Sequence, residues 1–292
     1  MIDYEIVDMF TDTPFAGCAL GVVPDASGLG DGDMRAVAGE IALTETAFVL
    51  PPLSPEATYR VRVFTPDGES PYGGHSSVGT AATLVRTGRV PAGAVVQECG
   101  GKLLSLDASP EGAVLTVRGE PPAPRTWDHA ALLASCGLTD DDLVGRPRVA
   151  GFGPAFHILP VRAEAVARAV RDASAPVWDT CSDAVVVAYD RATRCARVRV
   201  FAPGYGMPED PACASAALGL GPWLAHAGLL PGADGTFDYR VLQGAEMGRP
   251  ATLRCTVTVR GARAVAAGVF GQVAAVAQGR MRVPSGVTAA RV

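Results

Sequence analysis

The chain has 292 residues, of which 48% are hydrophobic and 19% are charged, so it is long enough for one large domain or two domains of common size. Its net charge of −5 comes from acids and bases scattered along the sequence, which argues against a nucleic-acid-binding surface. No apolar run reaches the ~18–20 residues that a membrane span needs, so we expect no membrane insertion.

The N-terminal stretch MIDYEIVDMF has no basic segment followed by an apolar core, which predicts a cytoplasmic protein without a signal peptide. The chain has seven cysteines and no C-x-x-C pair, which argues against a disulfide framework and a structural zinc site. We therefore predict no metal site, and we expect most of these thiols to be small buried groups. Only Cys213 stands in a context that points to chemistry.

Alternating apolar residues dominate the chain, as they do in half-buried strands, and helical patterns are fewer. A Pro-rich polar segment at 118–130 is interpreted as a linker. The expected elements in chain order are a helix over 32–41, a strand over 59–64, a helix over 75–88, a strand over 114–119, helices over 129–138 and 163–172, a strand over 197–201, a helix over 214–228 and a strand over 252–261.

The five residues RVRVF occur twice, at 60–64 and 197–201, and each copy continues through a proline and a Gly/Pro-rich turn into a small-residue helix. Both of these helices are apolar on nearly every side, which is typical of buried helices. The offset is about half the chain, longer than the ~20–50 residues of a solenoid repeat, and favours a duplicated domain. We predict an N-terminal domain over 1–120 and a C-terminal domain over 121–292, with a return of the last strands to the first domain left open.

The two helix starts, GGHSS (73–77) and DPACAS (210–215), combine small residues with groups that hold protons. The first N–H groups of a helix have no partner within the helix and carry partial positive charge. Two such starts at one cleft would bind a carboxylate or stabilise a developing anion. The groups able to hold or transfer protons are His75, Ser76, Ser77, Asp210, Cys213 and Ser215.

Each candidate also has a structural interpretation, and the residues alone leave the choice open. Serine is a common N-cap, histidine can be a satisfied structural residue, an aspartate before proline often forms a turn, and cysteine is often a small buried group. Glu45 stands between two threonines ahead of the apolar run AFVL. A glutamate at a strand entrance is usually solvated or caps a neighbouring group.

Five segments together carry a family resemblance: VDMFTDTPFAGCALGVV (7–23), LTETAFV (43–49), VRVFTPDGESPYGGHSSVGTA (61–81), RVFAPGYGMPEDPACASAA (199–217) and QGAEMGRP (243–250). The sequence resembles the PhzF-like (phenazine biosynthesis) proteins, which share the diaminopimelate epimerase fold. The resemblance implies an α+β protein of two similar domains, each a β-barrel-like sheet around a central helix, with the active site between them. It also implies a homodimer and no cofactor.

The resemblance implies that Glu45 is the catalytic glutamate and that His75, Asp210 and Ser215 are the active-site histidine, aspartate and serine. All four residue types are retained. The residues expected to line the substrate site are Gly73, Gly74, Ser76, Ser77, Ala212, Cys213 and Ala214.

Related epimerases and racemases place one cysteine at the start of each central helix and use the two thiols on opposite faces of a carbon. Here the first such position is Gly73 and the second is Cys213, which disfavours a two-thiol inversion. Cys18, Ser76 and Ala214 also depart from the residues that are usual in the family, and these changes put the phenazine precursor in doubt as the substrate.

We therefore predict a cofactor-independent isomerase of secondary metabolism that shifts a double bond in a small unsaturated cyclic amino or imino acid. Glu45 would remove a proton from one carbon and return it to another. Two alternatives stay open: a one-thiol epimerase that pairs Cys213 with Glu45, and a relative that binds a metabolite without catalysis.

Overall fold

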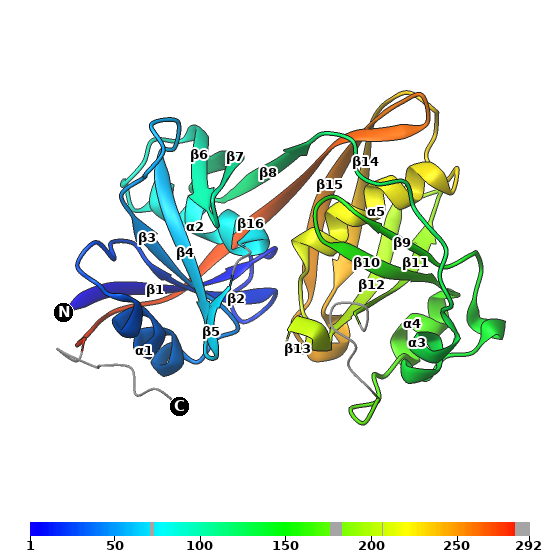
Figure 1. Ribbon diagram of the computed structural model, residues 1–292, viewed down its shortest axis with the longest axis horizontal. Coiled ribbons are helices and arrows are strands. Elements are labelled where there is room, and N and C mark those ends of the chain that lie inside the picture. Colours follow the sequence, from blue (N-terminus) through cyan, green and yellow to red (C-terminus); the bar gives the residue numbers. More distant parts are fainter. Residues whose placement is uncertain (71–72, 176–182, 206, 284–292) are drawn as a thin grey trace. The chain divides into compact units, whose positions relative to one another are not determined.

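The structure is a computed structural model that describes residues 1–70, 73–175, 183–205 and 207–283, without the side chains of His75 and Tyr205 (Figure 1). The chain forms two compact units: residues 1–116 with the chain from residue 270 onward, and residues 117–269. The sequence places the division at residue 120 and leaves open a return of the last strands. In the structure the division lies at residue 116, and the chain returns to the first unit at residue 270.

The first unit is a closed sheet, because its first strand pairs with β16, the last strand in the described part of the chain. Neighbouring strands follow the order β1 (Ile2–Met9), β2 (Cys18–Val23), β3 (Thr46–Leu50), β4 (Tyr59–Thr65), β6 (Gly93–Cys99), β7 (Lys102–Ser109), β8 (Gly112–Arg118) and β16 (Arg263–Met281), and the short strand β5 (Gly68–Ser70) pairs with β4. Its helices are α1 (Asp31–Ile41) and α2 (Gly74–Arg86).

Helix α2 is the central helix of the first unit and packs against β1, β2, β3 and β7 (Figure 1). Val78, Ala81 and Leu84 on this helix are fully buried, as expected for a helix that is apolar on nearly every side. Gly79 allows close packing, because a Cβ at this position would lie 2.6 Å from Leu20 Cδ2. The sequence prediction of a buried helix here is confirmed.

The second unit repeats the strand order and orientation of the first. The pairs β2–β3 and β4–β6 are parallel, and so are their counterparts β10–β11 and β12–β14, while the pairs that follow them along the chain are antiparallel. Its elements are α3 (Ala130–Ser135), β9 (Arg148–Gly151), β10 (Ala155–Pro160), α4 (Ala163–Arg168), β11 (Ala184–Asp190), β12 (Cys195–Ala202), β13 (Met207–Asp210), α5 (Ala214–His226), β14 (Gly235–Gln243) and β15 (Ala251–Arg260), with short 3₁₀ turns at Asp140–Asp142, Pro203–Tyr205 and Ala245–Met247.

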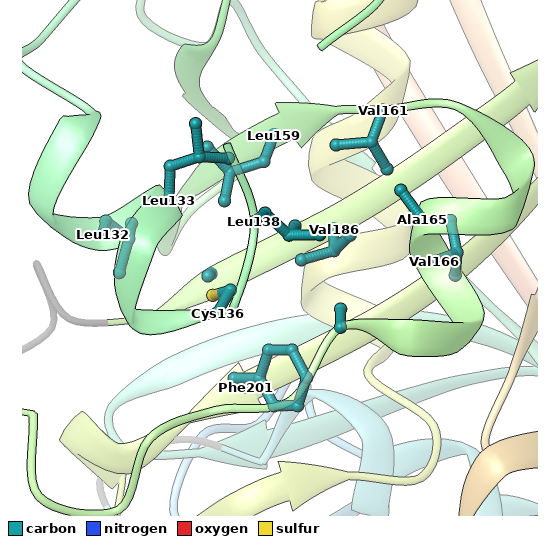
Figure 2. Close-up of a cluster of buried hydrophobic side chains, with 12 residues drawn as sticks. Leu132, Leu133, Cys136, Leu138, Leu159, Val161, Ala165, Val166, Val186 and Phe201 are labelled. Carbon is teal, nitrogen blue, oxygen red and sulfur yellow. The ribbon is translucent and has the colours of Figure 1, made fainter. Parts of the chain in front are cut away.

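A hydrophobic cluster joins α3 and α4 to the strands of the second unit. Side chains of Leu133 and Val166 on the two helices point toward Leu159, Val186 and Phe201 on β10, β11 and β12 (Figure 2). Fully burying an aliphatic or aromatic side chain stabilises a fold by about 1.5–3 kcal/mol. This cluster therefore fixes α3 and α4 to the sheet of the second unit. The central helix α5 packs separately, on β9, β10 and β15.

Helix α4 is shorter than the sequence pattern indicates, ending at Arg168 although the helical pattern extends to residue 172. Ala169 leaves the helical conformation with φ −59° and ψ 129°, and its carbonyl accepts a hydrogen bond from the Arg199 guanidinium. A tertiary contact from a distant strand thus ends the helix, which local sequence cannot indicate.

The repeated RVRVF stretch builds the same ion pair in both units. The third residue, Arg62 or Arg199, binds a carboxylate of the following short strand, Glu69 or Glu209, through Nε at 2.8 Å and Nη2 at 2.6 Å. Hydrogen bonds to these carboxylates raise the pKa of both guanidinium groups. Each pair ties β5 to β4, or β13 to β12, just before the central helix begins.

The two ion pairs differ in burial, and this predicts different contributions to stability. Side-chain exposure is 9% and 14% in the Arg199–Glu209 pair, but 22% and 45% in the Arg62–Glu69 pair. We expect Glu209→Gln to lower the free energy of unfolding by about 3 kcal/mol, because it leaves a buried guanidinium uncompensated. Glu69→Gln should cost less than about 1 kcal/mol. Calorimetry of both variants measures the two shifts, and equal shifts would contradict this ranking.

Candidate active site

Glu45 lies at the entrance of β3, at the end of the first unit where helix α2 begins. Strand β3 is antiparallel to β4 with Thr46 opposite Phe64, and the chain continues from the end of β4 through β5 to α2. Glu45 is half-buried, and its backbone carbonyl accepts a hydrogen bond from Gly21 N at 3.1 Å. Cys99 is the last residue of β6. Burial raises the pKa of its thiol, and the negative charge of Glu45 raises it further.

Helix α2 begins after its N-cap, Gly73, which has no side chain with which to cap the helix. The Ser77 hydroxyl donates to the Gly73 carbonyl and accepts a hydrogen bond from Gln97 Nε2 at 2.7 Å. Neither Ser76 nor Ser77 is the N-cap, so that structural interpretation is wrong for both. The Ser77 hydroxyl is instead engaged within the helix start.

The other predicted residues of this helix start differ in their surroundings. Gly74 is the first helical residue and is half-buried. Ser76 is fully buried, and within the described part of the chain its Oγ has no hydrogen-bond partner. His75 lies in the helix, but its side chain is outside the described part of the structure.

Asp210 ends strand β13 and is 2% exposed. Its Oδ1 accepts a hydrogen bond from Ala212 N at 2.9 Å, the turn that an aspartate before proline often forms. The structural interpretation of Asp210 therefore holds for one carboxylate oxygen. This turn bond engages Oδ1 of the carboxylate.

The start of helix α5 presents backbone and thiol groups. Cys213 is the N-cap and is 8% exposed, and Ser215 is half-buried in the first turn. Ser215 is not the N-cap, so that interpretation is wrong. Ala212 and Ala214 are both 0% exposed, so these two expected lining residues are fully buried.

Gln243, the last residue of β14, clamps this helix start and is a residue that the sequence analysis missed. Its Nε2 donates to the Asp210 carbonyl at 2.5 Å, and its Oε1 accepts from Cys213 N at 3.2 Å. The side chain is 3% exposed, so it replaces two backbone partners where water has little access. A glutamine inside the matched segment 243–250, at the end of an alternating strand, is the signal that could have revealed it.

The counterpart of Glu45 in the second unit is Asp183, which the sequence analysis also missed. Strands β3 and β11 begin opposite Phe64 and Phe201, the last residues of the two RVRVF copies, and each acid directly precedes its strand. Asp183 is 1% exposed, and its Oδ1 accepts from Gly204 N at 2.9 Å. The same repeat position thus carries a carboxylate that holds a turn in one unit and a half-buried glutamate in the other.

The structure groups the predicted residues within each unit. The first unit holds Glu45 and the α2 start, and the second holds Asp210 and the α5 start. Within the described ranges, no group of three or more His, Cys, Asp or Glu residues is arranged to hold a metal ion. The helices of the same ranges include none that is both long and apolar enough to cross a bilayer.

Comparison with known proteins places the chain in a family. The family model of phenazine biosynthesis-like proteins (PhzC-PhzF) matches residues 7–279. An uncharacterised isomerase of Mesorhizobium japonicum is 33% identical, covering 96% of this chain and 98% of the relative. The trans-2,3-dihydro-3-hydroxyanthranilate isomerase of Pseudomonas aeruginosa is 31% identical, covering 95% and 98%. The crystal structure of a PhzF-family phenazine biosynthesis protein from Bacillus anthracis superposes with a TM-score of 0.81 at 23% identity, covering 97% and 99%.

The chain belongs to the phenazine biosynthesis-like protein family, as the sequence resemblance predicts. It has the diaminopimelate epimerase-like fold, in which a sheet surrounds a central helix in each of two similar units. It is an enzyme of the isomerase class, since its curated relatives are isomerases.

The Gln243 clamp predicts a specific effect on the α5 start. Gln243→Leu keeps the volume but leaves a buried carbonyl and a buried N–H unpaired, which costs about 1–3 kcal/mol for each group. We expect a lower melting temperature and faster amide exchange over residues 211–215, measured by calorimetry and hydrogen-exchange mass spectrometry. The matched control is Gln278→Leu, at an exposed position of β16. Unchanged exchange at 211–215 would show that the clamp does not hold this segment.

Proposed function

We propose that the chain is a cofactor-independent isomerase that shifts a double bond in a small, unsaturated, cyclic amino or imino acid of secondary metabolism. The observation that supports this most directly is the position of Glu45. This half-buried carboxyl side chain stands at the end of the unit where α2 begins, in a chain whose relatives are isomerases. We further propose that it acts as a cytoplasmic homodimer.

In the proposed reaction Glu45 is the general base and then the general acid. It takes a proton from a carbon next to a π system, and the electron pair of the broken C–H bond moves into the conjugated system. The protonated Glu45 then returns the same proton to another carbon, so a C–H bond forms there and the double bond has moved. One carboxyl group suffices when both carbons lie on the same face, and positioned acid–base catalysis contributes about 10²–10⁴-fold.

The helix starts supply the binding groups in this proposal. First-turn N–H groups of α2 and α5, which have no partner within the helix, would bind the substrate carboxylate and stabilise negative charge as the proton leaves. His75, Asp210 and Ser215 would orient the other polar groups of the substrate.

The substrate proposal follows the relatives only in part. The Pseudomonas aeruginosa relative is named for trans-2,3-dihydro-3-hydroxyanthranilate, an unsaturated cyclic amino acid of the proposed class. Cys18, Ser76 and Ala214 depart from the usual family residues and are each almost fully buried. We therefore propose the class rather than this one compound, and use the compound as the first probe.

The predicted test of the base is Glu45→Gln, which keeps the size of the side chain and removes its proton-accepting carboxylate. We expect kcat for trans-2,3-dihydro-3-hydroxyanthranilate to fall at least about 10²-fold. Proton NMR in D₂O follows both the double-bond shift and any deuterium uptake. The control is Glu40→Gln, an exposed glutamate on α1. A Glu45→Gln enzyme within a few-fold of wild type would remove Glu45 from the mechanism, and binding without turnover by the wild type would favour the non-catalytic alternative.

The one-thiol alternative has a separate test, because Cys213 stands at the N-cap of α5. If Glu45 does the proton transfer alone, Cys213→Ala should keep kcat within about fivefold of wild type, since it removes a lining group and not the base. If Cys213 is the opposing acid or base, the same variant should lose activity as completely as Glu45→Gln. Steady-state kinetics of both variants under one set of conditions decide between the two.

A further inference from the structure

Cys99 fills the space that a side chain at residue 73 would occupy. A Cβ built on Gly73 would lie 2.7 Å from Cys99 Sγ and 3.6 Å from Ser76 Oγ. A carbon and a sulfur cannot approach that closely without one of them moving. The Gly73 backbone has φ −141° and ψ 36°, a negative φ open to other residues. The sulfur, and not the backbone conformation, therefore excludes a side chain at the start of α2.

Strand β6 fixes this thiol firmly. Cys99 is the last residue of β6 and pairs with Lys102 across a two-residue turn, Gly100–Gly101, whose φ angles of 56° and 73° suit a tight hairpin. Gln97, two residues earlier on the same strand, binds Ser77 in the first turns of α2. Since alternate strand residues face the same side, Cys99 is directed toward the same helix start.

The equivalent of Cys99 in the second unit is Gln243, which has a known set of contacts. The parallel strands pair Arg60 with Glu98 in one unit and Arg197 with Leu242 in the other. Because the two arginines begin the RVRVF copies, the next residues, Cys99 and Gln243, are equivalent. Gln243 uses its amide to satisfy the backbone at the α5 start. Cys99 is too short to clamp the α2 start in that way.

An unpaired hydroxyl lies at the same point. Ser76 is 0% exposed, and its Oγ has no hydrogen-bond partner within the described ranges, in contrast to the fully engaged Ser77. A buried hydroxyl without a partner costs about 1–3 kcal/mol. A polar atom of a bound ligand would remove that cost. Thiol and hydroxyl therefore converge on one place at the start of a buried 13-residue helix.

We propose that Cys99 is a substrate-contacting residue at the start of α2, where with Ser76 it takes the place of a side chain at residue 73. The inference rests on the proposed function and names a further binding residue for it. The ligand group it fits is a small acceptor, such as a carboxylate or carbonyl oxygen of the substrate.

The electrostatics define how Cys99 would act. Burial, and then the negative charges of Glu45 and Glu69, raise the pKa of its thiol to about 11. At neutral pH the group stays protonated, so it serves as a hydrogen-bond donor and not as a nucleophile. Holding an acceptor of the substrate beside Glu45 would orient the carbon acid toward its base.

The test removes the thiol at residue 99 and places one at residue 73, at the start of α2. Cys99→Ala should lower kcat/KM for trans-2,3-dihydro-3-hydroxyanthranilate by about tenfold, the effect of one lost contact to the substrate. The double variant Gly73→Cys/Cys99→Ala restores a thiol to the same place and should recover to within about threefold of wild type. The matched control, Gly73→Ala/Cys99→Ala, has the same backbone change without sulfur and should stay low.

Two further measurements make the result independent of turnover and of misfolding. Calorimetric titration with 3-hydroxyanthranilate, an aromatic analogue without a carbon to deprotonate, should show weaker binding in Cys99→Ala and recovery in the thiol-transfer variant. The melting temperature should fall in Gly73→Ala and recover in Gly73→Ala/Cys99→Ala, because removing the sulfur removes the clash. Should Cys99→Ala fail to fold, Cys99→Val replaces it, because valine fills the space of the thiol without a hydrogen-bond donor.

The outcomes separate this inference from the proposed function. An inactive Glu45→Gln enzyme together with a Cys99→Ala enzyme that retains wild-type kcat/KM and affinity would overturn the role of Cys99 alone. Equal rescue by Gly73→Cys and Gly73→Ala would also overturn it, since packing and not the thiol would then matter. An active Glu45→Gln enzyme would overturn the proposed function and this inference with it.

Discussion

The start of a buried helix is the constraint on which the rest of this structure depends. Such a helix has N–H groups that need partners where water is scarce. In the second unit Gln243 satisfies part of this need by binding the backbone on both sides of the turn into α5. The Arg–Glu pairs of the two RVRVF copies hold the short strands that lead into each helix. Position and polarity of the helix starts are thereby set by strands around them.

Duplication supplied two copies of this arrangement, and substitution made them unequal. The acid ahead of the third strand of each unit holds a turn as Asp183 but stands half-buried as Glu45. The residue that follows the parallel β4–β6 or β12–β14 pair also differs. In the second unit it is Gln243, which binds the backbone at the α5 start, and in the first it is Cys99, whose thiol lies against Gly73. In both comparisons the second unit uses the side chain for structure. The two units therefore differ at both of these equivalent strand positions.

The fold was largely predictable, because alternation, buried-helix composition and the RVRVF repeat are local signals that the strands and helices of the structure follow. The boundaries were less so: α4 ends at Arg168 because a guanidinium from a distant strand takes the next carbonyl. Of the site, the helix starts were visible as Gly- and Ser-rich stretches. Gln243, Asp183 and Cys99 were not, since their positions beside the helix starts and turns arise from strand pairing between segments far apart in the sequence.

The path of β16 has a consequence for biosynthesis. The second unit is one continuous stretch of chain, whereas the first is closed by β1 pairing with residues 273–281 at the far end of the sequence. A ribosome that has released residues 1–116 has therefore exposed an open sheet with an unsatisfied edge, and that edge persists until residues 273–281 have been released. Early termination within the last strand would leave one half complete and the half that carries Glu45 unsealed.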